Sequence, residues 1–227
     1  MPEPKGGRHA LLIDFGGVLT TSVTRSFRAF CTEMGLPPEL AKEAFVEAYH
    51  HHEGTSPVHQ VETGEITVEE FGVGLAEVLS RRSGVEVPAE GLVAKLFARM
   101  DLDEEMFAAV GAARRAGIHT GLLSNSWGTD AYPHERFDEV FDVVVISGDV
   151  GLRKPDPAIF TLAAEKMGVA PTDCVFVDDL DKNLHVAESL GMVAILHRST
   201  AETIAQLAEH LGLDLALLRA PQPRPRA

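Results

Sequence analysis

The sequence predicts an α/β fold, in which a doubly wound, five-stranded parallel sheet carries an inserted domain of α-helices. Five short apolar runs are continuous rather than alternating, which is typical of parallel strands covered on both faces. Helical patterns separate most of these runs, as expected where strands alternate with helices. The stretch from 21 to 103 breaks this alternation, because it is rich in helical patterns and contains no convincing strand.

The predicted elements follow in chain order. The five strands are Ala10–Ile13, Thr120–Ser124, Val143–Ile146, Cys174–Val177 and Val193–Leu196. Each predicted helix of the sheet layer ends next to a glycine, which suits a helix C-cap. These helices are Met106–Ala116, Pro157–Met167, Asn183–Leu190 and Thr203–Leu211. In the inserted stretch, helical patterns cover Ser26–Met34, Pro38–His50, Val68–Arg81 and Glu90–Arg99.

We expect residues 8–20 and 104–215 to form the core around the sheet, and residues 21–103 to form a helical cap. Residues 1–7 and 216–227 have the composition of flexible tails. Ligands of open α/β sheets bind beyond the carboxyl ends of the strands. A helical insertion directly after the first strand would therefore cover such a site as a lid.

Composition and charge limit the classes of partner. The chain has 227 residues, of which 45% are hydrophobic and 24% are charged, and this excludes a mostly disordered or fibrous chain. The formal net charge of −14 repels nucleic acid and anionic membranes, so we expect neither as a partner. No apolar run reaches the roughly 18 residues that span a bilayer. No secretory signal is visible and the two cysteines are far apart, so we expect a cytoplasmic protein. The sequence leaves open whether it is a monomer or a homodimer.

Polar clusters follow the predicted strands at the edge where their carboxyl ends meet. The clusters are D-F-G-G-V-L-T at 14–20, S-N-S-W at 124–127, G-L-R-K-P-D-P at 151–157 and D-D-L-D-K-N at 178–183. Three acidic residues from two strand ends can hold a hard cation such as Mg²⁺. A carboxylate beside that metal can attack phosphorus, while a hydroxyl, backbone N–H groups and a lysine hold the other phosphoryl oxygens. Trp127 either lines the mouth of the pocket or packs the loop.

This combination resembles the haloacid dehalogenase (HAD) superfamily, whose motifs match I-D-F-G-G-V-L-T, L-L-S-N-S, R-K-P-D-P and V-F-V-D-D-L-D-K-N. The resemblance extends from about Ala10 to Leu213, and the helical block corresponds to a C1-type cap. Within the superfamily, the chain is similar to the N-terminal phosphatase domain of soluble epoxide hydrolases. The resemblance implies a Rossmann-like core and a Mg²⁺-dependent phosphohydrolase that acts on a small phosphorylated metabolite through an aspartyl phosphate.

The resemblance also implies roles for the acidic residues. Asp14 would be the nucleophile and a ligand of Mg²⁺, and the main-chain oxygen of Gly16 would be a second ligand. Asp179 would be the carboxylate ligand from the fourth strand. Asp178 beside it would be a further ligand or would hold a water molecule.

Other roles concern the phosphoryl group. The Ser124 hydroxyl and the Asn125 backbone would grip it, and Lys154 would neutralise both nucleophile and substrate. Asn183 would anchor the Lys154 loop or the outer shell of the metal. From its position in the sequence, Arg153 is expected to be a surface residue and not a ligand contact.

One position departs from the family pattern. Phosphatases of the superfamily usually have a second Asp two residues after the nucleophile, which protonates the leaving group and then activates water, whereas this chain has Gly16. Such a group is worth roughly 10²–10⁴ in rate. Either the substrate has a good leaving group, such as an acyl or anomeric phosphate, or a cap residue replaces the acid, or the protein is slow or inactive. The cap candidates are His50, His51, His52, Glu53 and His59.

Three other functions fit part of the sequence. A non-catalytic or regulatory binding protein would keep the fold and turn nothing over, and Gly16 supports this alternative. A metal-free dehalogenase is less favoured, because Asp178 and Asp179 would have no role in it. A phosphonate-cleaving enzyme needs a Schiff-base lysine from the cap, but Lys42 and Lys95 lie in helical patterns with no special surroundings.

Overall fold

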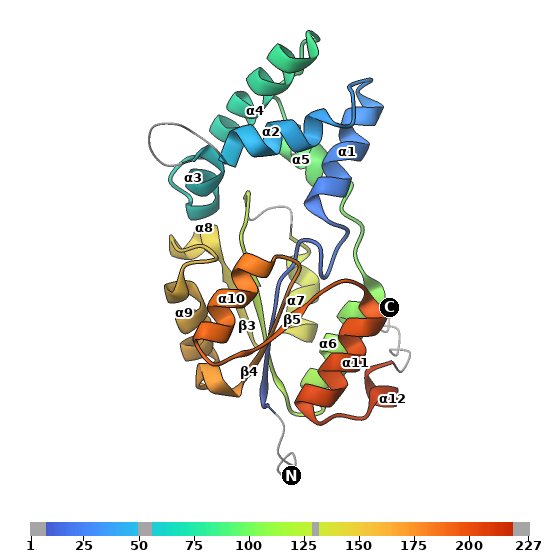
Figure 1. Cartoon of the computed structure of the whole chain (residues 1–227), viewed down its shortest axis with the longest axis vertical. Coiled ribbons are helices and arrows are strands. Elements are labelled where there is room, and N and C mark those ends of the chain that lie inside the picture. Colours follow the sequence, from blue (N-terminus) through green and yellow to red (C-terminus); the bar gives the residue numbers. More distant parts are fainter. Residues whose placement is uncertain (1–7, 50–55, 129–131, 220–227) are drawn as a thin grey trace.

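The computed structural model in Figure 1 describes residues 8–49, 56–128 and 132–219. Its described part contains a five-stranded sheet of order β3-β2-β1-β4-β5, in which all neighbouring strands are parallel. The strands are β1 Ala10–Ile13, β2 His119–Ser124, β3 Val143–Ile146, β4 Cys174–Asp178 and β5 Val193–Leu196. The predicted doubly wound parallel sheet is confirmed, with β2 and β4 each extended by one residue.

Helices cover both faces of the sheet (Figure 1). The main helices are α6 Glu104–Arg115 and α11 Thr200–Leu211 in one layer, and α9 Pro157–Met167 and α10 Asp181–Ser189 in the other. Successive side chains of a strand point to opposite faces. Leu11 and Ile13 of β1 accordingly join the apolar cluster of α6 and α11, whereas Ala10 and Leu12 join that of α9 and α10. This double burial explains why the strands read as continuous apolar runs.

Shorter helical segments complete the core. They are α7 His134–Val140, α8 Ser147–Val150, a 3₁₀ turn at Pro171–Asp173 and α12 Leu215–Leu218. The expected tail boundary at residue 216 was wrong, because α12 packs on α6 and leaves Leu218 only 1% exposed. The remaining tail residues, 1–7 and 220–227, lie outside the described residues. No helix in the described ranges has the length and apolarity that crossing a membrane requires.

The inserted stretch folds into helices, which Figure 1 shows beyond the carboxyl edge of the sheet. These helices, called the cap helices below, are α1 Val23–Glu33, α2 Leu40–Tyr49, α3 Pro57–Thr63, α4 Val68–Ser83 and α5 Leu92–Phe97. They enclose an apolar cluster of their own, in which Phe27 and Leu79 are buried. The chain enters and leaves them side by side, because Thr20 and Leu102 form an antiparallel bridge. The short helix α3 was not predicted.

Candidate active site

Three carboxylates meet where β1 and β4 end. Asp14 follows β1 directly, Asp178 is the last residue of β4, and Asp179 comes next in the chain. The Asp14 N–H donates to the Val177 carbonyl at 2.9 Å, so the parallel pairing of the two strands continues into the site. Each of the three side chains offers an oxygen, and these oxygens lie within 4.8 Å of one another. The topology therefore brings together acidic residues that are far apart in the sequence.

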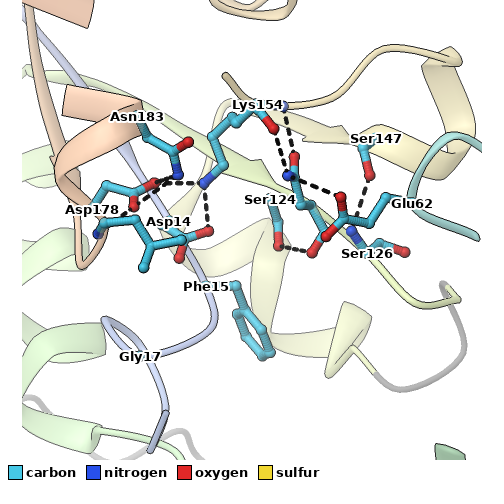
Figure 2. A network of polar contacts seen from close by, with 12 residues as sticks. Asp14, Phe15, Gly17, Glu62, Ser124, Ser126, Ser147, Lys154, Asp178 and Asn183 are labelled. Atoms are coloured by element: carbon cyan, nitrogen blue, oxygen red, sulfur yellow. Dashed lines mark hydrogen bonds and ion pairs between the residues drawn. The ribbon is translucent and has the colours of Figure 1, made fainter. Parts of the chain in front are cut away.

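Lys154 reaches these carboxylates from the loop after α8 (Figure 2). Its ammonium donates to Asp14 Oδ1 and to Asp178 Oδ2, at 2.7 Å each. Asn183 in the first turn of α10 donates from Nδ2 to both oxygens of Asp178 at 3.0 Å. All of these groups are buried, and the Lys154 side chain is only 2% exposed. Asn183 thus acts on Lys154 through Asp178.

Two adjacent glycines beside the carboxylates differ in the space around them. Gly17 has a φ of +87°, and a Cβ at this position would lie 2.4 Å from Oδ2 of Asp179. A glycine therefore lets the backbone pass this carboxylate. A Cβ at Gly16 would lie 3.5 Å from Val23 and 3.7 Å from Met100, which are ordinary contact distances. Gly16 lines the pocket, and its surroundings would accommodate a Cβ.

Burial and mutual repulsion disfavour negative charge on the carboxylates. Burial, together with the charges of Asp178 and Asp179, raises the pKa of Asp14 to about 7, although Lys154 opposes this shift. Burial and the charge of Asp178 raise the pKa of Asp179 to about 6. Burial alone would lower the pKa of Lys154, but the charges of Asp14 and Asp178 raise it above its usual range. Lys154, together with a smaller effect of Lys182 on Asp179, thus leaves the pKa values of Asp14 and Asp179 raised.

The donor set fits a hard divalent cation such as Mg²⁺. Carboxylate oxygens are its preferred protein ligands, and three of them converge here. A cation would offset the mutual repulsion of these carboxylates and would favour the ionised forms of Asp14 and Asp179. In addition, the buried Oδ1 of Asn183 has no hydrogen-bond partner among the described residues. Asn183 itself is one of the residues that line the same pocket.

Ser124 and Asn125 bring polar groups from the end of β2. The Ser124 hydroxyl lies 2.8 Å from the hydroxyl of Tyr132. Burial raises the pKa of Tyr132 above its usual range, so the phenol stays protonated. The Asn125 side chain accepts from the Lys154 N–H at 2.8 Å and donates to the Lys154 carbonyl at 2.9 Å. Sequence reasoning expected the backbone of Asn125 at the site and missed both this clamp and Tyr132, a lone tyrosine in no motif.

The carboxylates open into a pocket of about 300 Å³ that the core and the cap helices line together. Its apolar lining residues include Val23, Phe97, Met100 and Trp127. The Trp127 ring centroid lies 5.0 Å from that of Phe71 and 6.2 Å from that of Phe97. Trp127 therefore lines the pocket and also packs its loop against the cap helices. Both of the roles considered for it from the sequence apply.

The expectation that Arg153 lies at the surface was wrong. Its Nε donates to Oε2 of Glu62 in α3 at 2.6 Å, and the two side chains are 16% and 4% exposed. Glu62 lines the pocket and was also missed, although it follows the buried Val58 at the i, i+4 spacing that shares one helix face. His59 lies in α3 and is not among the described residues that line the pocket. The candidates at 50–53 lie outside the described residues.

Curated relatives of this chain include phosphatases. It is 27% identical to the bifunctional epoxide hydrolase 2 of Mus musculus, over 93% of this chain and 40% of that protein. It is 26% identical to the D-ribitol-5-phosphate phosphatase of Bacteroides thetaiotaomicron, over 80% of this chain and 87% of that protein. The acyl-CoA dehydrogenase family member 10 of Mus musculus is 30% identical over 97% of this chain. The chain spans only 21% of that protein. It therefore covers less than half the length of each of the two mouse relatives.

The fold and the motifs point to one family. A HAD family enzyme from Bacteroides thetaiotaomicron, solved in complex with magnesium and inorganic phosphate, matches with a TM-score of 0.60 and 23% identity, over 85% of this chain and 95% of that one. This likeness shows the shared fold. The family model of haloacid dehalogenase-like hydrolases matches residues 9–191, which confirms the resemblance that the motifs predict. The chain belongs to the haloacid dehalogenase-like hydrolase family, and phosphatases are among its relatives.

Proposed function

We propose that the chain is a Mg²⁺-dependent phosphohydrolase that cleaves a small phosphorylated metabolite through an aspartyl phosphate on Asp14. The observation that carries this proposal is the 2.7 Å contact of Lys154 with both Asp14 and Asp178, beside a pocket that Asp179 also lines. A nucleophile, its counter-charge and a cation-binding carboxylate are thus within reach of one phosphoryl group.

Asp14 is the proposed nucleophile. One of its carboxylate oxygens forms a bond to phosphorus, while the bond between phosphorus and the leaving oxygen breaks and that oxygen keeps the electron pair. Lys154 reduces the repulsion between the anionic carboxylate and the anionic phosphoryl group. The Ser124 hydroxyl and the Asn125 backbone N–H hold phosphoryl oxygens. Water then hydrolyses the aspartyl phosphate, which releases inorganic phosphate and restores Asp14.

Asp14, the main-chain oxygen of Gly16 and Asp179 are the proposed ligands of Mg²⁺, which when bound supplies positive charge to the phosphoryl oxygens. Both oxygens of Asp178 already accept hydrogen bonds from Asn183, and one also accepts from the lysine. We therefore assign Asp178 to holding the lysine and Asn183 to supporting Asp178.

Gly16 narrows the proposed substrates. Among the described pocket residues, Glu62 is the titratable side chain that the cap helices contribute, and Arg153 already engages its carboxylate. Burial raises the pKa of Glu62 and the Arg153 charge opposes this shift, but the Arg153 hydrogen bond occupies the carboxylate in a contact between the cap helices and the lysine loop. We therefore favour substrates that need little protonation, such as acyl or anomeric phosphates.

Two alternatives are weaker. Gly16 favours a non-catalytic binding protein, but such a protein would not need Lys154 between two carboxylates. A metal-free dehalogenase would leave Asp179 without a role.

Residues 21–103 are proposed as the cap that covers the pocket and selects the substrate. The enzyme is proposed to be cytoplasmic.

The test is phosphate release from a panel of phosphorylated metabolites and from an activated aryl phosphate. Wild type and Asp14→Asn are compared in Mg²⁺ and in EDTA. We expect release that EDTA and the substitution each abolish, with a bias toward good leaving groups. No release from any substrate, with Mg²⁺ still bound, would favour the binding protein.

A further inference from the structure

A buried ion pair joins the cap helices to the loop that carries Lys154. Arg153 precedes Lys154 in this loop, and Glu62 lies in the last turn of α3. The distance from Arg153 Nε to Glu62 Oε2 is 2.6 Å, and the Glu62 side chain is only 4% exposed. A buried charge is strongly unfavourable without its partner, so each of these residues keeps the other in place.

The Glu62 carboxylate also approaches the residue that clamps Lys154. Its Oε2 lies 3.5 Å from Nδ2 of Asn125. The same Nδ2 donates to the Lys154 carbonyl, and Oδ1 of Asn125 accepts from the Lys154 N–H. In Figure 2, Glu62 and Asp178 lie on opposite sides of Lys154. The Lys154 backbone is thus held by Asn125 directly and by Glu62 through Arg153. A small shift of this backbone would move the ammonium from its 2.7 Å contacts.

The pair lies away from the place where the chain enters and leaves the cap helices. That connection is the bridge between Thr20, which precedes α1, and Leu102, which follows α5, and Figure 1 shows these two helices on the side away from α3. At the opposite side of the cap helices, α3 packs against α8, where a Cβ at Gly64 would lie 3.0 Å from the carbonyl oxygen of Gly148. The pair therefore fastens the cap helices to the core at a second place, next to the lysine loop.

We propose that Glu62 and Arg153 are positioning residues that place the Lys154 ammonium only while α3 is seated on the core. A substrate body that holds α3 away from α8 would also displace Lys154. The pair would in this way make the position of the Lys154 ammonium depend on how well the substrate fits the pocket. The kinetic consequence rests on the proposed phosphohydrolase function, whereas the structural coupling does not.

The test uses hydrogen exchange, followed by mass spectrometry, in the full chain. The peptide at 151–156 reports on the Lys154 amide, whose N–H donates to Asn125 Oδ1 at 2.8 Å. The control removes an ion pair between Arg136 and Glu104, which lies at the surface of the part of the chain that surrounds the sheet. The variants are Glu62→Gln, Arg153→Gln, Arg153→Lys, the double variant Glu62→Gln/Arg153→Gln, and the control Glu104→Gln.

We expect exchange at 151–156 to be at least about 10-fold faster in each single Gln variant, and unchanged in the control and in β1. The double variant should be no faster than the more affected single variant, because the two residues act as one unit. Arg153→Lys keeps the charge and should recover part of the protection. In phosphatase assays, kcat should fall by about 10- to 100-fold with a smaller change in KM.

Unaltered exchange at 151–156, or effects of the two residues that add in the double variant, would overturn the proposal. A single variant that exchanges rapidly throughout has unfolded. In that case the exchange rate at 151–156 in the double variant, which buries no unpaired charge, decides whether the proposal stands. If wild type releases no phosphate from any substrate, the proposed function fails, and the exchange result still decides whether the pair positions Lys154.

Discussion

The ammonium of Lys154 lies 2.7 Å from Oδ1 of Asp14, although 140 residues separate the two in the sequence. The same ammonium lies 2.7 Å from Oδ2 of Asp178. One cation therefore restrains carboxylates from two neighbouring strands, while Asp179 adds a third negative group. We expect a site with this charge to bind a cation and then an anionic substrate, and variants of its residues should affect the two kinds of binding separately.

Asp14→Asn should abolish phosphatase turnover, with kcat lower by at least about 10⁴-fold, because the amide cannot act as the nucleophile. In EDTA the same variant should be more stable than wild type by about 1 kcal/mol, or roughly 2–4 °C in Tm, since it removes a repelled buried charge. Thermal unfolding and single-turnover assays measure the two effects. Substantial turnover in this variant would exclude Asp14 as the nucleophile.

Adding Mg²⁺ should raise the Tm of wild type. A ligand present at about 100 times its Kd stabilises the native state by about 2.7 kcal/mol, which corresponds to roughly 5–10 °C here. Asp179→Asn should remove most of this increase, whereas Glu104→Gln at an exposed core position should keep it. Thermal unfolding with and without EDTA checks the prediction. An equal increase in both variants would place the cation elsewhere.

The sheet and the carboxylates could be predicted because their signals are local. A parallel strand that is buried on both faces, such as Ala10–Ile13, needs a continuous apolar run. Polar residues directly after two such runs, such as Asp14 and Asp178, must lie at the same edge once the strands are neighbours. Lys154 lies in a polar segment that was placed at the same edge, but its specific role beside the carboxylates came from the resemblance to a family.

Glu62, Arg153 and Tyr132 escaped prediction because their roles depend on contacts between distant segments. Glu62 and Arg153 are 91 residues apart and reach each other only once α3 lies on the core. Tyr132 meets Ser124 through a loop with no regular pattern. The end of the chain was misjudged for a related reason, since Leu218 looks like a tail residue until α6 offers it a buried place.

Tyr132→Phe should weaken phosphate binding with little effect on the fold. Losing the hydrogen bond to Ser124 should cost about 1 kcal/mol of stability and raise KM and the inhibition constant of inorganic phosphate by roughly 5-fold. If Tyr132 acts by orienting the Ser124 hydroxyl, adding the substitution to Ser124→Ala should change nothing more. Steady-state kinetics on the single and double variants measure this. Additive losses would show a separate role for Tyr132.

Gly16→Asp should supply an acid/base group at the position two residues after the proposed nucleophile. The new Cβ meets only ordinary contacts with Val23 and Met100, and the position lines the pocket. We expect kcat on alkyl phosphates, which have poor leaving groups, to rise by about 10- to 100-fold. Hydrolysis of an activated aryl phosphate should gain little, because its leaving group needs little protonation. Kinetics across leaving groups of increasing pKa check this difference.

Two control variants separate acid catalysis from a change of shape. Gly16→Asn has the same size without the acid and should give no gain on alkyl phosphates. Gly17→Ala places a Cβ 2.4 Å from Oδ2 of Asp179 at a φ of +87°, so it should lower both Mg²⁺ binding and turnover. Equal gains in Gly16→Asn and Gly16→Asp would mean that the side chain reshapes the pocket instead of donating a proton. A gain confined to Gly16→Asp would identify protonation of the leaving group as the step that the natural glycine makes slow.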